Sequence, residues 1–200
     1  MFLSRVYVTW PRSKNAYALH QALWELFPNR PDDERDFLFR VEREKTGQGA
    51  MLLMQSKQSP VDAAESVEVQ ATKGYALNMA EGQRIRFLLK ANPIKTIKDE
   101  KGRKNAKGEV KSCRVPLIKE EEQLQWLARK LEGVAVLEEA NVSNCLPMYF
   151  KKSNRAGKVV PVVFEGIASV IDIKAFQSML EFGVGPAKAL GCGMVSVATA

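Results

Sequence analysis

The chain has 200 residues, 46% hydrophobic and 26% charged, and its formal net charge of +7 favours a polyanionic partner such as nucleic acid. Its single histidine and three scattered cysteines, Cys113, Cys145 and Cys192, argue against a disulfide framework or a metal site. The first residues lack the apolar core of a signal peptide, and no apolar run could cross a membrane, so we expect a cytoplasmic protein without a membrane partner.

The first 80 residues follow the element order β-α-β-β-α-β. Ser13 is expected to cap the first helix, which ends before Pro28, and Pro60 to occupy the first turn of the second. The expected strands are 2–10, 37–42, 50–55 and 67–71, and the expected helices are 15–24 and one that begins at 59–64. This order is typical of a ferredoxin-like fold, an antiparallel sheet with two helices on one face.

A second β-α-β-β-α-β series follows. A polar stretch over 96–114, interrupted by Gly102 and Gly108, is expected to be a mobile loop. The expected strands are 83–91, 134–137, 148–150, 159–166 and 194–198, and the expected helices are 119–131 and 173–182. We therefore predict an α+β protein of two tandem ferredoxin-like (RRM-like) domains, 1–80 and 81–200, although the aromatic RNA-binding pattern of standard RRM sheets is missing.

The helix expected over 15–24 contains the histidine, His20. Its apolar side chains recur at helical spacing and form one stripe, whereas Tyr17, His20 and Trp24 form a second stripe around the helix. His20 is thus expected at the border between core and solvent, one turn from the Tyr17 phenol. A lone histidine beside an apolar stripe is more often structural than chemical, so the helix by itself leaves both roles open.

The stretch from Gly183 to Gly193 holds four glycines, Gly183, Gly185, Gly191 and Gly193, together with Lys188. Glycines allow a ligand to approach the backbone closely, and Lys188 adds a positive charge, so this stretch predicts a phosphate site. It is neither a Walker A loop nor a dinucleotide-binding fingerprint. A tight turn without a ligand explains the glycines equally well.

Two basic segments could contact nucleic-acid phosphates. One is a hairpin tip with Lys151, Lys152, Arg155 and Lys158, and the other is the stretch from Lys95 to Arg114, with Arg103, Lys104 and Lys111. A solvated surface is the alternative for both. No carboxylate pair stands out for two-metal nuclease chemistry, but RNA cleavage through the 2′-OH needs only proton transfer and charge stabilisation. A histidine, a tyrosine and a lysine can supply these.

Several runs resemble the CasE-type CRISPR-associated endoribonucleases of type I-E systems, in the same order along nearly the whole chain. They are Leu19–Trp24 with Leu26–Pro31, Arg35–Phe39, Ala91–Ile97, Cys113–Lys119 and the tail Gly183–Gly193. The resemblance implies two tandem ferredoxin-like domains, in agreement with the element order. It also implies metal-independent cleavage of CRISPR precursor RNA at the 3′ base of the repeat stem-loop, without a cofactor, giving a 2′,3′-cyclic phosphate and a 5′-OH.

The resemblance further implies that the enzyme stays on the 3′ hairpin of the crRNA beside the other subunits of the Cascade complex, including its backbone protein. It makes His20 the catalytic histidine, Tyr17 its companion, Gly183–Gly193 an RNA-binding loop and Lys151–Lys158 the hairpin that enters the RNA groove. Two alternatives stay open: a non-catalytic subunit that binds an RNA hairpin, and a small-molecule phosphate or nucleotide binder.

Overall fold

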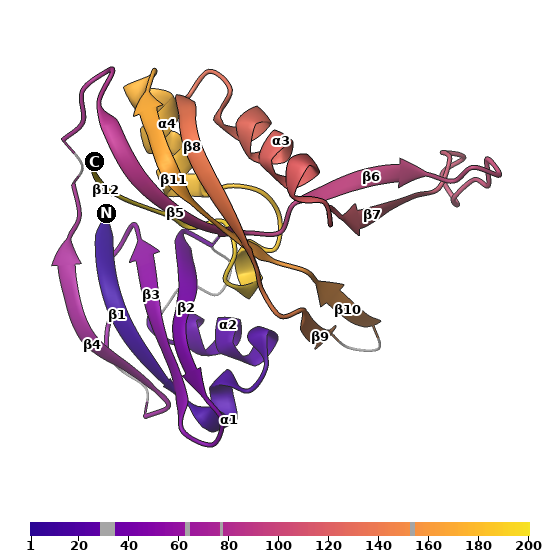
Figure 1. The fold of residues 1–200 in the computed structure, drawn as a ribbon. Coiled ribbons are helices and arrows are strands. Elements are labelled where there is room, and N and C mark those ends of the chain that lie inside the picture. Colours follow the sequence, from indigo (N-terminus) through magenta and orange to yellow (C-terminus); the bar gives the residue numbers. More distant parts are fainter. Residues whose placement is uncertain (29–34, 63–64, 77, 153–154) are drawn as a thin grey trace.

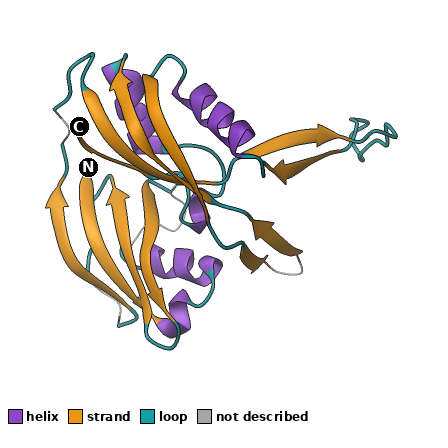
Figure 2. Ribbon diagram, in the orientation of Figure 1, coloured by secondary structure: helices purple, strands orange, loops and turns teal. Residues whose placement is uncertain are grey.

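The computed structural model describes residues 1–28, 35–62, 65–76, 78–152 and 155–200, and their side chains except those of 151, 152, 155 and 156. Two four-stranded antiparallel sheets make up the body, each with its helices against one face (Figures 1 and 2). Their strand orders, β2-β3-β1-β4 and β12-β5-β11-β8, are both the order of a ferredoxin-like fold. The predicted fold class is therefore confirmed.

The first sheet contains β1 (Phe2–Thr9), β2 (Phe37–Lys45), β3 (Gly49–Ser56) and β4 (Val67–Gly74), with the helices α1 (Trp10–Ser13) and α2 (Ala16–Trp24). Alternate side chains of the central strands, such as Val6 and Leu52, are buried under α2. The second predicted helix is wrong as far as it is described, because residues 59–62 are not helical. There the Val61 N–H donates to the Leu26 carbonyl, which anchors this segment to the end of α2.

The second sheet contains β5 (Arg84–Ala91), β8 (Ala135–Asn144), β11 (Val162–Val170) and β12 (Val195–Thr199), with the helices α3 (Glu120–Leu131) and α4 (Ile173–Phe182). The α4 helix has the predicted bounds, and Asp172 caps it by accepting a hydrogen bond from the Ala175 N–H at 2.9 Å. Trp126 of α3 stacks on Phe164 of β11 in the core between helices and sheet. None of the described helices has the length and apolarity needed to cross a lipid bilayer.

Two hairpins project from the second half (Figure 1). The hairpin of β6 (Ile94–Lys98) and β7 (Ser112–Pro116), here called the arm, extends away from the body, and that of β9 (Met148–Lys152) and β10 (Arg155–Val159) lies near α2. The prediction of a mobile loop over 96–114 is wrong, because its two ends pair as strands. Near the tip, the Asn105 side chain accepts hydrogen bonds from the backbone of Lys107 and Glu109, which folds the polar connection back on itself.

Direct contacts, which we call the seam, join the first half to β12 and α4 of the second half. The Arg40 guanidinium donates to the Ser196 hydroxyl at 2.8 Å, and the buried Gln55 amide donates to the Leu180 carbonyl at 2.8 Å. An ion pair between Lys57 and Glu181 adds to them. The strands of the first sheet end at Gly74 and those of the second begin at Arg84, while the domain boundary at residues 80–82 stays a prediction.

Candidate active site

The α2 helix places its functional side chains through a cap at Asn15. The Asn15 carboxamide oxygen accepts hydrogen bonds from the N–H groups of Tyr17 and Ala18, at 2.9 and 2.8 Å. The prediction of Ser13 as the cap is wrong, because Ser13 is buried as the last residue of α1. With the helix fixed in this register, Leu19, Ala22 and Leu23 are buried and the opposite faces are left for the polar residues.

His20 is half-buried against aromatic rings, at the border between core and solvent where the sequence placed it. Its ring centroid lies 5.8 Å from that of Phe37 and 6.4 Å from that of Trp24, the latter in an edge-to-face arrangement. Phe37 is itself buried under Phe27, which it stacks on at 5.3 Å. The imidazole is therefore held by packing, while Tyr17 lies half-exposed one turn earlier on the same helix.

Two segments of the C-terminal half contact α2. They are β9 and the short helix η1 (Lys188–Leu190), which also approaches β2 (Figure 1). The predicted catalytic helix, glycine-rich loop and basic hairpin, distant in sequence, thus meet at one place between the two sheets. Such a junction can contact one extended ligand from both halves.

Protein side chains pack closely against the glycines of the glycine-rich loop. A Cβ on Gly185 would come within 2.8 Å of the Trp126 ring, one on Gly183 within 2.8 Å of Leu38, and one on Gly191 within 3.2 Å of Phe39. All three glycines, and Gly193 as well, have positive φ, so the turn itself requires them. Packing and turn geometry therefore account for all four.

The backbone N–H groups of this loop are also largely engaged within the protein. Those of Val184 and Gly193 donate to the carbonyls of Gly193 and Lys90, at 2.8 and 2.7 Å. Those of Gly183, Leu190, Gly191 and Cys192 likewise donate to protein carbonyls. These six N–H groups are thus used in holding the loop together, and an anion at this loop would also meet the Lys188 side chain.

Lys188 belongs to a group of three cations, which we call the cation cluster, with Arg35 and Lys130. Burial lowers the pKa of Lys188 from its ordinary value, and the positive charges of Arg35 and then Lys130 lower it further. The ammonium donates to the Phe182 carbonyl at 2.6 Å, and Lys130 lies over the Trp126 ring. Like charges gathered at a half-buried place favour an anion as the neutralising partner.

The sequence did not identify Arg35 or Lys130 as site residues. The three members come from the residues before β2, from the last turn of α3 and from η1, and nothing in their spacing links them. Only the way in which the two halves pack against each other brings these side chains together. The contact of Phe37 with His20 lies within the first half, and it was missed because it depends on how α2 packs on β2.

The basic hairpin beside α2 is a pair of strands, β9 and β10, and residues 153–154 between them lie outside the described residues. Lys151 and Lys152 lie in β9, and Arg155 and Lys158 in β10, where Lys152 pairs with Arg155 and Lys158 with Tyr149. Of these four predicted RNA-binding residues, the structure describes the side chain of Lys158 alone, which is exposed. The predicted contribution of the other three stays a prediction.

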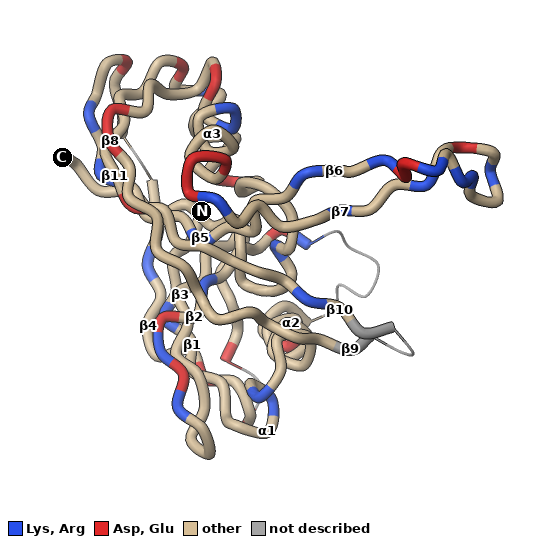
Figure 3. Tube along the Cα trace, turned by 45° about the vertical axis from the view of Figure 1, so that its right-hand side comes forward, with Lys and Arg blue, Asp and Glu red and all other residues tan. Residues whose placement is uncertain are grey.

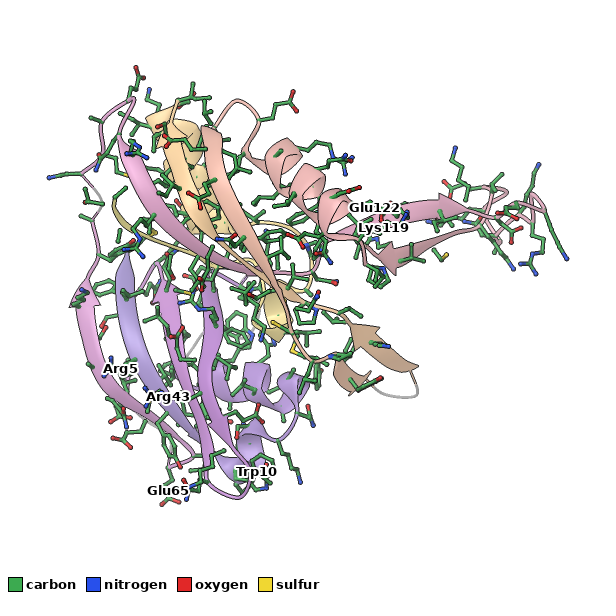
Figure 4. The ribbon with its side chains drawn as sticks, in the orientation of Figure 1. Arg5, Trp10, Arg43, Glu65, Lys119 and Glu122 are labelled. Atoms are coloured by element: carbon green, nitrogen blue, oxygen red, sulfur yellow. The ribbon has the colours of Figure 1, made fainter. Side chains whose placement is uncertain are left out.

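The basic residues of the arm have different partners. Figure 3 shows Lys and Arg along the arm, and Figure 4 labels Glu122 at its base. Lys95 forms an ion pair with Glu122 of α3 at 2.8 Å, at the base of the arm, and Arg103 pairs with Asp99. Lys104 forms an isolated bridge with Val110, and Lys111 donates its N–H to the Arg103 carbonyl. Arg114, like the others, is exposed. The arm points away from α2, so it would contact a different part of any bound ligand.

The state of the Cys192 thiol and the distribution of the described metal-ligating side chains both bear on the chemistry of the site. Cys192 lies within the glycine-rich loop, where burial raises its pKa to about 12, so the thiol stays protonated and is a poor nucleophile. Among the described residues, no group of three or more His, Cys, Asp or Glu side chains could hold a metal ion. The side chains of His20 and Tyr17 can take part in proton transfer, and their catalytic role stays a prediction.

Known proteins match this chain along its whole length. A family model described as CRISPR associated protein covers residues 1–199. The Cascade subunit CasE of the Escherichia coli K12 CRISPR system is 45% identical over 198 residues, 99% of both chains. The crystal structure of the CRISPR-associated protein Cas6e from E. coli K-12 has a TM-score of 0.87 at 42% identity, covering 100% of both chains.

A more distant relative is the CRISPR-associated endoribonuclease Cse3 of Thermus thermophilus, 32% identical over 201 residues, 92% of this chain and 90% of that one. A structure of Thermus thermophilus Cse3 bound to an RNA representing a pre-cleavage complex has a TM-score of 0.75 at 30% identity, with 98% of both chains covered. With a family model over nearly all its residues and a relative 45% identical along its length, this chain belongs to the CRISPR-associated protein family.

Proposed function

We propose that this protein is an endoribonuclease that cleaves CRISPR precursor RNA at the base of the repeat stem-loop. One observation carries the proposal: the helix with Tyr17 and His20 lies where η1 and the basic hairpin of the other half converge. Membership of a family that includes a CRISPR-associated endoribonuclease and a Cascade subunit supports it.

In the proposed reaction the 2′-OH of the nucleotide before the cut attacks the adjacent phosphorus. The oxygen of the 2′-OH loses its proton as the P–O bond forms, and the 5′ oxygen of the next nucleotide gains a proton as its bond to phosphorus breaks. His20 makes one of these proton transfers, and the Tyr17 hydroxyl positions the 2′-OH or the phosphate. The products are a 2′,3′-cyclic phosphate and a 5′-OH, formed without a metal ion or cofactor.

The basic surfaces would hold the RNA through its phosphates, which is the usual origin of RNA affinity. Lys188 and the cation cluster lie on the α2 side, and the arm offers a second contact farther along the stem. After cleavage, the protein would keep the 3′ hairpin of the crRNA and join the other subunits of a Cascade complex. The name of E. coli CasE, a Cascade subunit, supports the second part. A cytoplasmic location is part of the same proposal.

Labelled repeat RNA incubated with the purified protein in EDTA tests this function. We expect a single cut at the base of the stem, at an undiminished rate, with a 2′,3′-cyclic phosphate on the 5′ fragment and a 5′-OH on the other. Cleavage that stops in EDTA would require a metal-dependent mechanism. Tight binding without any shortening of the RNA would favour a non-catalytic hairpin-binding subunit instead.

Lys188→Met should weaken RNA binding without weakening the fold. The environment already disfavours the charged lysine, because burial and the nearby Arg35 and Lys130 lower its pKa, and methionine keeps most of the apolar stem. We expect the free protein to keep or raise its melting temperature. The slope of log K against log salt should become shallower by roughly one, as for a lost phosphate contact.

Lys45→Met is the matched control, because Lys45 is exposed at the end of β2 and outside the cation cluster. It removes the same charge from the molecule as a whole. An equal change of salt slope in both variants would mean that net charge, and not the cation cluster, determines RNA affinity. A fall in melting temperature confined to Lys188→Met would identify Lys188 as a structural residue.

A further inference from the structure

A large aromatic side chain lies open to solvent on the hairpin beside α2. Tyr149 of β9 is 68% exposed, which is unusual for a tyrosine that has a strand partner. Its partner across the hairpin is Lys158 of β10, whose ammonium lies 5.6 Å from the centre of the Tyr149 ring. Tyrosine and lysine thus form a cation–π pair on the outer face of the hairpin.

The other face of the hairpin fixes this pair in place. Phe150, the next residue, points to the opposite side because side chains alternate along a strand. Its ring covers Gly157, the residue opposite, so closely that a Cβ there would come within 2.3 Å. Phe150 is half-buried in this way, whereas Tyr149 is exposed. Phe150 therefore packs within the hairpin, and the ring of Tyr149 is open to solvent.

The place of the hairpin indicates what Tyr149 could meet. Its strand β9 lies against α2, the helix of Tyr17 and His20, so an RNA cut at His20 passes close to it (Figure 1). An unpaired base has two apolar faces that stack well on an aromatic side chain, and a neighbouring cation suits the adjacent phosphate. An apolar protein partner would match this pair less well, because it would bury the Lys158 charge without compensation.

We propose that Tyr149 is a stacking platform for an unpaired RNA base next to the cleavage site, with Lys158 beside the phosphate of that nucleotide. This inference rests on the proposed function and adds a specific binding contact to it. Its energetic role is to fix a flanking nucleotide, and with it the scissile phosphate, relative to His20. Stacking tolerates different bases, so the contact would hold the strand without reading its sequence.

Fluorescence of 2-aminopurine tests the contact directly. Repeat RNAs would carry this base at single positions on either side of the scissile bond, with a 2′-deoxy nucleotide before the bond to prevent cleavage. Wild-type protein should quench the probe at one flanking position, and Tyr149→Leu should abolish this quenching and weaken binding about tenfold. Tyr149→Phe keeps the ring and should retain both the quenching and the RNA affinity of the wild type. Lys158→Met should give an affinity between those of the wild type and Tyr149→Leu.

Tyr75→Leu is the control, because Tyr75 is a half-buried tyrosine directly after β4. The strand β4 lies at the side of the molecule away from this hairpin (Figure 1). The Tyr75→Leu variant should quench the 2-aminopurine probe and bind the repeat RNA as the wild type does. Wild-type quenching and affinity in Tyr149→Leu would overturn the inference. So would normal RNA binding by Tyr149→Leu combined with failure to assemble with the other Cascade subunits, which would make Tyr149 a protein contact.

Cleavage of unmodified RNA, measured in parallel, separates this inference from the proposed function. A wild-type protein that does not cut would contradict the function alone, because quenching at a flanking base is read on uncleaved RNA. If the wild type cuts and Tyr149→Leu needs no more protein than the wild type for half-maximal single-turnover cleavage, only the stacking contact fails. A raised half-saturating protein concentration with a preserved melting temperature is the expected result.

Discussion

His20→Ala should slow cleavage of repeat RNA by about 10²–10⁴-fold, the usual contribution of a general acid or base. The variant loses the one imidazole in the chain, and the thiol of Cys192, in the loop that packs against α2, stays protonated because burial raises its pKa. Alanine suits the middle of α2, so the helix and its Asn15 cap should persist. Single-turnover cleavage and filter binding measure the two expectations: a much lower rate and nearly unchanged affinity for the RNA.

Gln21→Ala is the matched control, since Gln21 is the exposed neighbour on the same helix and should leave the rate unchanged. Tyr17→Phe separates two roles that spacing alone cannot distinguish. The hydroxyl that is proposed to position the 2′-OH or the phosphate is absent from Tyr17→Phe, so cleavage should slow. A wild-type rate would mean that only the ring of Tyr17 has a role. Cleavage by His20→Ala at the wild-type rate would remove His20 from the reaction.

Phe37→Ala should lower the free energy of unfolding by about 3–5 kcal/mol, the usual cost of truncating a buried aromatic residue. Phe37 is 2% exposed, and its ring contacts those of Phe27, Trp24 and His20 at centroid distances of 5.3, 5.3 and 5.8 Å. The cavity would open directly beside His20. Urea denaturation measures the stability, and cleavage below the unfolding transition should fall as well, because the imidazole loses its packing.

Phe37→Leu distinguishes loss of packing from loss of the ring, because it removes less volume and should cost distinctly less than alanine. Phe182→Ala is the stability control: Phe182 is 59% exposed and its loss should change the free energy of unfolding by no more than about 0.5 kcal/mol. Equal unfolding energies for Phe37→Ala and Phe182→Ala would show that the aromatic cluster does not stabilise the first domain.

The regular elements were readable from the sequence because each carries a local signal. The helix Ile173–Phe182 has an aspartate cap and apolar residues at helical spacing, and its bounds are those predicted. The strands of both sheets carry alternating side chains, and their order along the chain indicated two ferredoxin-like units. The N-cap shows the limit of such signals: Ser13 and Asn15 are both good caps, and the short helix α1 ends at Ser13.

The site was harder to predict because it depends on contacts between the two halves. The resemblance to a family directed attention to His20 and Tyr17, but the cation cluster of Arg35, Lys130 and Lys188 has no pattern in the sequence. The arm was missed for a different reason. Its strands are polar and exposed on both faces, so they lack the apolar alternation that identifies a half-buried strand.

The seam has a consequence for where the RNA would be cut. Under the proposed function, His20 belongs to one half and the basic hairpins that hold the stem belong to the other. Their separation is fixed by the contacts of Arg40 with Ser196 and of Gln55 with Leu180. The protein then measures a constant length of RNA from the stem to the cut, and every guide RNA ends at the same nucleotide whatever spacer it carries.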